Sequence, residues 1–147
     1  IMAHNFAKYA HDGEQFVKEV AAAAGDPAGV DKAGRLLRAV LHALRNRLTP
    51  AESLQLISQF PMLIKAIYVD GWRISDEAKR LRTLGDFIEA VREEGGRATV
   101  NDFVSDREVE HAIQAVFKVV KNHVSAGEIR DILATLPEGL RPLLSKA

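Results

Sequence analysis

An all-α fold is the structural class that this sequence predicts, and three features predict it. Apolar residues recur every three or four positions over long stretches, as they do on the buried face of a helix. No segment alternates apolar and polar residues over a useful length, as a half-buried strand would. The same apolar pattern also occurs twice along the chain. We therefore expect a tandem duplication of a roughly four-helix unit, packed as one compact helical domain.

Composition favours a single globular domain over residues 1–147. The chain is 47% hydrophobic and 27% charged, which is ordinary for a globular protein. Twenty Lys and Arg residues balance twenty Asp and Glu residues, and this balance argues against nucleic acid as the partner. The absence of cysteine excludes disulfides, thiolate nucleophiles and thiolate metal sites.

The sequence carries no feature of a membrane or secreted protein. Its first residues lack the apolar core of a signal peptide, and no apolar run approaches the length of about eighteen residues that spans a bilayer. Together with the absence of cysteine, these features predict a cytoplasmic protein with no membrane contact.

An internal repeat relates residues 12–68 to residues 83–144, and residues 69–82 join the two copies. Residues 39–52 (AVLHALRNRLTPAE) align with residues 115–128 (AVFKVVKNHVSAGE) at an offset of 76 without a gap. Apolar positions continue to match downstream. Upstream the offset falls to 71, so about five extra residues separate the first two helices of the second copy.

The first helix of each copy is marked by residues typical of helix ends. Asp12 and Thr83 each stand three residues before a side chain that can reach back, as in a capping arrangement. Gly25 and Gly95 are suited to the left-handed conformation that ends a helix.

The second helix of each copy has an apolar residue at every third or fourth position, which predicts one buried face. These residues are Ala33, Leu37, Val40, Leu41, Leu44 and Leu48 in copy one, and Val109, Ile113, Val116, Phe117, Val120 and Val124 in copy two.

Capping boxes predict the start of the third helix in both copies. Thr49 with Glu52, and Ser125 with Glu128, have the spacing at which the hydroxyl accepts from the third amide and the glutamate reaches back. Each N-cap contributes about 1 kcal/mol, so these shared polar residues have a structural explanation. A proline then precedes a short apolar fourth helix in each copy.

A row of basic residues runs along the second helix of copy one, opposite its apolar side. This basic face comprises Lys32, Arg35, Arg38, His42 and Arg45. It is either a surface for anions, nucleic acid or an acidic partner, or an ordinary solvated helix face. We favour the solvated face, because copy two reproduces the row only in half and no aromatic residues interleave with it for base stacking.

Glu108 and His111 have the Glu-x-x-His spacing found in di-iron helical bundles. Their repeat equivalents are Lys32 and Arg35, which are cations. Glu108 also fits as the capping partner of Ser105. We therefore expect no metal site and no cofactor.

Tyr68, Trp72 and Arg73 form the most distinctive local sequence and include the one tryptophan of the chain. In one interpretation, which we favour, Trp72 fills the seam between the copies. In the other, the three residues anchor a ligand or partner at the repeat junction, because aromatic residues and Arg are frequent in binding hot spots.

No catalytic motif is present. The chain has no Gly-x-Ser-x-Gly nucleophile elbow, no Gly-x-Gly-x-x-Gly and no phosphate-binding Gly-Lys-Ser/Thr loop. We assign no catalytic residue, and the sequence favours a binding protein over an enzyme.

The stretch from Leu36 to Trp72 (LLRAVLHALRNRLTPAESLQLISQFPMLIKAIYVDGW) resembles the bacterial "domain of unknown function 2267" family. The similarity lies in the Leu-Arg-Ala-Val-Leu-His helix, the Arg-Leu-Thr turn with its Glu, and the Gly-Trp that follows a Tyr. Phe60 precedes the proline where the family has Leu, a mild departure. The resemblance implies a bacterial, cytosolic, all-helical protein, and it transfers no catalytic residue.

Three functions remain open. The leading hypothesis is a non-enzymatic helical interaction module that binds a protein partner or itself, because duplicated helices offer broad surfaces. The alternative is a small-ligand-binding protein or enzyme with a pocket at the repeat junction, and the third is weak binding of nucleic acid or anions through the basic face. A cavity with convergent polar groups favours a ligand, and an exposed apolar patch favours a partner.

Overall fold

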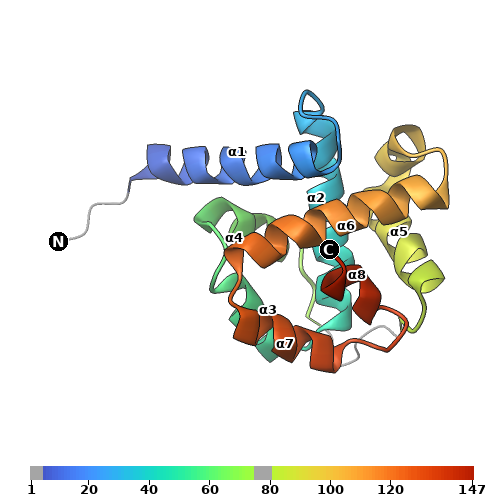
Figure 1. Ribbon diagram of the computed structural model, residues 1–147. Helices are drawn as coiled ribbons and strands as arrows, with labels where there is room; N and C mark the ends of the chain where they lie inside the picture. Colours follow the sequence, from blue (N-terminus) through green and yellow to red (C-terminus); the bar gives the residue numbers. More distant parts are fainter. Residues whose placement is uncertain (1–4, 75–80) are drawn as a thin grey trace.

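The computed structural model describes residues 5–74 and 81–147, apart from the side chain of Thr99, and no strand occurs among them (Figure 1). The predicted all-α class is confirmed. The helices are α1 (Phe6–Ala23), α2 (Val30–Arg47), α3 (Pro50–Ile57), α4 (Met62–Val69), α5 (Leu84–Asp102), α6 (Asp106–His123), α7 (Ala126–Thr135) and α8 (Arg141–Ser145).

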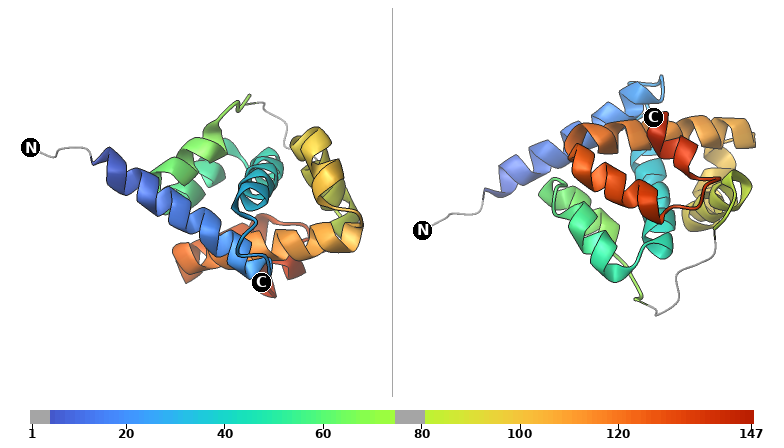
Figure 2. Two further views of the ribbon diagram at one scale, coloured as in Figure 1. Left: turned by 90° about the horizontal axis from the view of Figure 1, so that it is seen from above. Right: turned by 60° about the horizontal axis from the view of Figure 1, so that its bottom comes forward.

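Helix α2 lies at the centre of the molecule. It packs against α1, α4, α5 and α6, which surround it in the left view of Figure 2. Its apolar side supplies much of the core, including Leu37, Val40 and Leu41, whose side chains are fully buried. Any side chain on α2 is therefore close to one of four neighbouring helices.

Helix α6 has the same pattern of burial as α2. Both of its ends lie 76 positions after those of α2, and each of its eight buried residues lies 76 positions after a buried residue of α2. Helix α2 buries two more, His42 and Arg45, where α6 has Lys118 and Lys121. The tandem duplication itself stays a prediction, because shared burial does not establish common descent.

Helix α1 begins earlier than predicted and projects from the body (Figures 1 and 2). Asn5 is its N-cap, and the Asn5 Oδ1 accepts a hydrogen bond from the backbone N–H of Lys8 at 3.0 Å. The predicted start at Asp12 is wrong, because Asp12 lies inside the helix. The predicted end is confirmed, since α1 stops at Ala23 and Gly25 follows with a φ of +83°.

Helix α5 begins as predicted and bends where an end was expected. The Thr83 hydroxyl accepts from the Asp86 N–H at 3.1 Å, and the Asp86 carboxylate accepts from the Thr83 N–H at 3.2 Å. At Gly96 the backbone adopts a φ of +58°, which kinks the helix. The extra residues of copy two then continue as helix to Asp102 instead of forming a loop.

The two predicted capping boxes differ in the structure. Thr49 and Glu52 form the complete reciprocal pair at the start of α3. Ser125 accepts from the Glu128 N–H at 3.2 Å, but the Ser125 N–H donates to the Gln59 side chain at 2.6 Å and not to Glu128. The second capping box is therefore only half present. The Ser125 N–H instead links the start of α7 to the turn after α3.

The C-terminal segment with α7 and α8 lies at the front of the molecule in the right view of Figure 2. The Arg47 guanidinium, at the end of α2, donates to the carbonyl of Thr135 at 2.8 Å. In the turn before α8, Gly139 lies so close to the segment before α5 that an added Cβ would stand 2.6 Å from the carbonyl oxygen of Arg82. The Arg47 side chain thus joins the two halves of the chain, while the turn at Gly139 packs against the segment that leads into α5.

Candidate functional site

Three of the five side chains of the basic face bind partners at the surface of the molecule. The Arg35 guanidinium forms two hydrogen bonds with the Asp102 carboxylate, at 2.8 and 2.9 Å, and these bonds lower the pKa of Asp102. Arg38 forms an ion pair with Asp70 at 2.8 Å. The Lys32 ammonium lies 4.7 Å from the ring centroid of Phe103, within the range of a cation–π contact, and it has no carboxylate partner among the described residues.

The other two members of the basic face are buried, which differs from both interpretations of the sequence. His42 is 4% exposed and Arg45 is 7% exposed. The His42 Nε2 lies 2.7 Å from the carbonyl oxygen of Ile67, so this nitrogen donates to it. Arg45 donates to the carbonyl oxygens of Tyr68 at 2.7 Å and Asp70 at 2.9 Å.

These bonds show that the basic face joins α2 to α4. The last carbonyl groups of a helix have no partner within the helix, and cations near them interact favourably with the helix dipole. His42 and Arg45 satisfy the carbonyls at the end of α4. Burial lowers the pKa of both side chains, so His42 is held in its neutral form. Most of the side chains predicted to bind anions therefore contact other groups of the same chain.

Tyr68 and Trp72 are brought together at the end of α4, while Arg73 is exposed. Tyr68 is fully buried, and its hydroxyl lies 2.6 Å from the Ser53 Oγ. The Trp72 ring stands edge-on to the Tyr68 ring at 5.9 Å and is partly buried against the core. Tyr68 therefore cannot contact a ligand without unpacking the core, and part of residues 69–82 lies outside the described residues.

A groove runs between α1, α2 and α4, and we call it the α1–α4 groove. It has a volume of about 530 Å³ and is open to the surface. It was not predicted, because its walls come from three segments that are separate in the sequence. The lining residues are Ala10, Gly13, Glu14, Val17, Val30, Asp31, Gly34, Arg35, Leu63, Ile64 and Ile67.

Two exposed apolar side chains begin α4, and one of them, Leu63, lines this groove. Met62 is 46% exposed and Leu63 is 41% exposed, both on the first turn of α4. Gly13 of α1 allows α4 to approach closely, because an added Cβ would lie 3.1 Å from the Leu63 Cβ. The groove therefore presents apolar surface beside a helix, α1, that projects from the body.

One comparison with known proteins identifies the family of this chain. The model of a family described as "Uncharacterized conserved protein (DUF2267)" matches residues 13–143. This chain belongs to the DUF2267 family. No curated protein matches it. Since the family description names no activity, the function of this DUF2267 chain has to be argued from its geometry.

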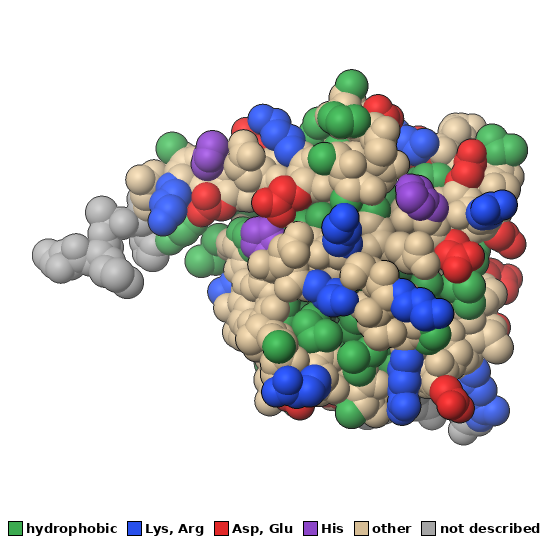
Figure 3. Space-filling model, in the orientation of Figure 1, with side chains coloured by type: hydrophobic (Ala, Val, Ile, Leu, Met, Phe, Trp, Pro, Cys, Tyr) green, Lys and Arg blue, Asp and Glu red, His purple; other side chains and the backbone are tan. Residues whose placement is uncertain are grey.

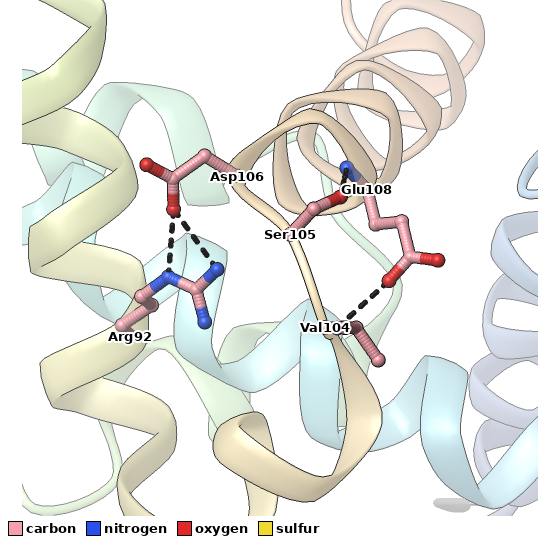
Figure 4. Close-up of polar contacts among 5 residues, drawn as sticks. All are labelled: Arg92, Val104, Ser105, Asp106 and Glu108. Carbon is pink, nitrogen blue, oxygen red and sulfur yellow. Dashed lines mark hydrogen bonds and ion pairs between the residues drawn. The ribbon is translucent and has the colours of Figure 1, made fainter.

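In this DUF2267 chain, Glu108 is part of the N-terminal cap of α6, as Figure 4 shows. The Ser105 Oγ accepts from the Glu108 N–H at 3.3 Å, and the Glu108 carboxylate accepts from the Val104 N–H at 2.8 Å. His111 is exposed one turn further along α6. Across residues 5–74 and 81–147, no group of three or more His, Asp or Glu side chains is placed to hold a metal ion.

The surface of this DUF2267 chain shows no large area of one charge on the face covered by α6 and α7. Lys and Arg side chains are spread over that face, with fewer Asp and Glu side chains among them (Figure 3). In the part of the chain that the structure describes, no helix combines the length and hydropathy needed to cross a bilayer.

Proposed function

We propose that this protein is a non-enzymatic interaction module that binds an amphipathic helix of a partner protein in the α1–α4 groove. The observation that carries the proposal is the groove itself, which is lined mainly by apolar residues and bordered by the exposed side chain of Leu63. Contiguous exposed apolar surface on a globular protein is typical of an interaction site.

The shape of the groove favours a helix as the bound element. Ala10 and Gly34 have a small side chain or none, and they leave room between α1 and α2. The larger apolar side chains of the lining come from α4. From Ala10 to Val17, α1 rises by about 10 Å, or two helical turns. That length suits two or three apolar anchors spaced at three and four residues on a partner helix.

The charges in the lining favour a partner with basic residues beside its apolar anchors. Glu14 and Asp31 are exposed and form no ion pair among the described residues. Arg35 is the one cation in the lining, and Asp102 neutralises it. The lining is therefore acidic overall, and basic residues on the partner would complement it.

The other two functions have less support from the geometry. Binding of nucleic acid through the basic face would require His42 and Arg45 to leave carbonyl groups that they satisfy. A ligand pocket at the repeat junction would require Tyr68, which is buried and bonded to Ser53.

Site-specific photo-cross-linking in cells tests this proposal. A photoreactive amino acid is placed at position 63, beside the groove, and at position 104 as the control. Val104 is 92% exposed and lies outside the lining of the groove. We expect position 63 to cross-link to a partner chain through an amphipathic helix with basic residues, and position 104 not to do so. Equal cross-linking from both positions would contradict the proposal, and cross-links to a second copy of this chain would assign the groove to self-association.

A further inference from the structure

A second cavity lies where α2 and α6 begin, and we call it the α2–α6 pocket. It has a volume of about 430 Å³, within the usual range for small-molecule sites. The end of α1 and the residue Phe103 complete its walls. The lining residues are Ala21, Ala24, Asp26, Gly29, Lys32, Ala33, Leu36, Phe103, Ser105, Arg107, Glu108, His111 and Ala112.

The pocket has an apolar floor made of short side chains. Four alanines contribute to it: Ala24 follows the end of α1, and the other three, Ala21, Ala33 and Ala112, lie in helices and are less than 5% exposed. Leu36 and Phe103 are buried beside them. Because alanine fills so little space, a cavity remains between these helices.

Both carboxylates in the lining lie at the N-terminus of a helix. Glu108 accepts from the Val104 N–H, and its own N–H is bonded to Ser105, so it caps α6. Asp26 lies against Gly29, the N-cap of α2, where a Cβ would overlap with its carboxylate. Negative charge at the start of a helix is stabilising. The N-termini of α2 and α6 therefore explain why both carboxylates are present in the lining.

The cations in the lining have no such role. Among the described residues, the cations Lys32 and Arg107 form no ion pair, and neither does His111. Nearby cations outside the lining are paired: Arg35, one turn from Lys32, binds Asp102, and Arg92 binds Asp106 at 2.9 Å on the far side of Ser105 (Figure 4). In this pocket, positive side chains that form no ion pair among the described residues thus stand beside an apolar floor.

We propose that the α2–α6 pocket binds a small organic acid that has an apolar body, such as an acyl or aryl carboxylate. The apolar body packs on the alanines and Phe103. The carboxylate binds Lys32, whose ammonium lies over the Phe103 ring, with Arg107 and His111 beside it. Charge-assisted hydrogen bonds of this kind are among the strong ones in proteins.

This site is separate from the α1–α4 groove. The pocket uses Lys32, Ala33 and Leu36 of α2, whereas the groove uses other positions of the same helix. Neither proposal depends on the other. Leu63→Arg, which places a charge at the edge of the groove, should leave ligand binding in the pocket unchanged.

Titration of the ¹⁵N-labelled protein with octanoate and with octylammonium tests the proposal, because these probes share one chain length and differ in charge. We expect octanoate to shift the backbone amide signals of residues 29–36 and 103–112 in a saturable way, and octylammonium to bind at least about tenfold more weakly. Lys32→Met should weaken octanoate binding about tenfold, because it removes the ammonium group that contacts the carboxylate. Lys18→Met, on the exposed side of α1, should leave it unchanged.

Three results would overturn the proposal: no saturable shifts with octanoate, equal binding of both probes, or shifts confined to the α1–α4 groove. Retention of the amide signals outside the pocket shows that Lys32→Met is folded. Should that variant unfold, Arg107→Met replaces it, because Arg107 is exposed. Undiminished octanoate binding by the folded variant would also refute the assigned role of the cation.

Discussion

Replacing Arg45 by methionine removes the guanidinium that joins α2 to α4 and keeps an unbranched apolar side chain in place of the arginine stem. In the folded protein this group donates to the carbonyl oxygens of Tyr68 and Asp70. The Tyr68 residue is fully buried, so its carbonyl has no access to bulk water. Asp70 is exposed, so water can replace the lost donor there.

The expected cost follows from these two bonds. A hydrogen bond from a charged donor contributes about 1.5–3 kcal/mol, and a buried acceptor left without a partner costs about 1–3 kcal/mol. The variant also removes a buried charge whose Nε has no partner, which offsets part of the loss. We therefore expect Arg45→Met to lower the free energy of unfolding by about 2 kcal/mol.

Urea unfolding measures this difference. Helical circular dichroism and the fluorescence of Trp72, whose ring lies 6.0 Å from the Arg45 guanidinium, report on the transition. Arg38→Met is the matched control on the same helix. Its ion pair with Asp70 joins side chains that are 48% and 63% exposed, and such pairs contribute less than about 1 kcal/mol. Equal midpoints for the two variants, or a more stable Arg45→Met, would refute the assignment of Arg45 as a cap of α4.

Further predictions concern glycines and pH. Gly34→Ala should raise the free energy of unfolding by about 0.5–1 kcal/mol in urea titrations, because alanine favours the helix and the new Cβ meets only Val17 at 3.9 Å. Gly139→Ala should lower the thermal midpoint, with a cost of about 1–3 kcal/mol, because its Cβ would stand 2.6 Å from the Arg82 carbonyl oxygen, which cannot rotate away. Burial lowers the pKa of His42, so the unfolded chain takes up this proton more readily than the folded protein does. Stability from His42 is therefore present above the unfolded pKa of about 6.5 and is lost as pH falls through the pKa of the folded state. His42→Gln should make the urea midpoint less dependent on pH between about 7.5 and 5.5; an unchanged dependence would contradict this.

The buried faces of α2 and α6 were predictable from the sequence. Apolar spacing alone identified the buried face of α2 and of α6, because burial imposes a period of 3.6 residues on the sequence. The start of α1 was not predictable in this way. Its first turns project from the body and bury no side chain before Gly13, so no apolar pattern marks them, and the prediction placed the cap at Asp12 instead of Asn5.

The roles of the basic residues could not be predicted, because they depend on a contact between helices. His42 and Arg45 are polar residues on a mainly polar side of α2, and their burial follows from the position at which α4 ends. The α2–α6 pocket also depends on tertiary structure, since Lys32 and Glu108 lie 76 residues apart and meet only where the two helices begin. Sequence spacing describes single elements, whereas these sites are made by pairs of elements.

Native mass spectrometry of the protein purified gently from its own host tests the central claim, partner binding in the α1–α4 groove, most directly when wild type and Leu63→Arg are compared. We expect the wild type to appear as a complex with another protein chain, and Leu63→Arg to appear at 16.2 kDa without that chain. A wild-type complex that persists in Leu63→Arg, or an unbound 16.2 kDa species for both proteins, would contradict partner binding in the groove.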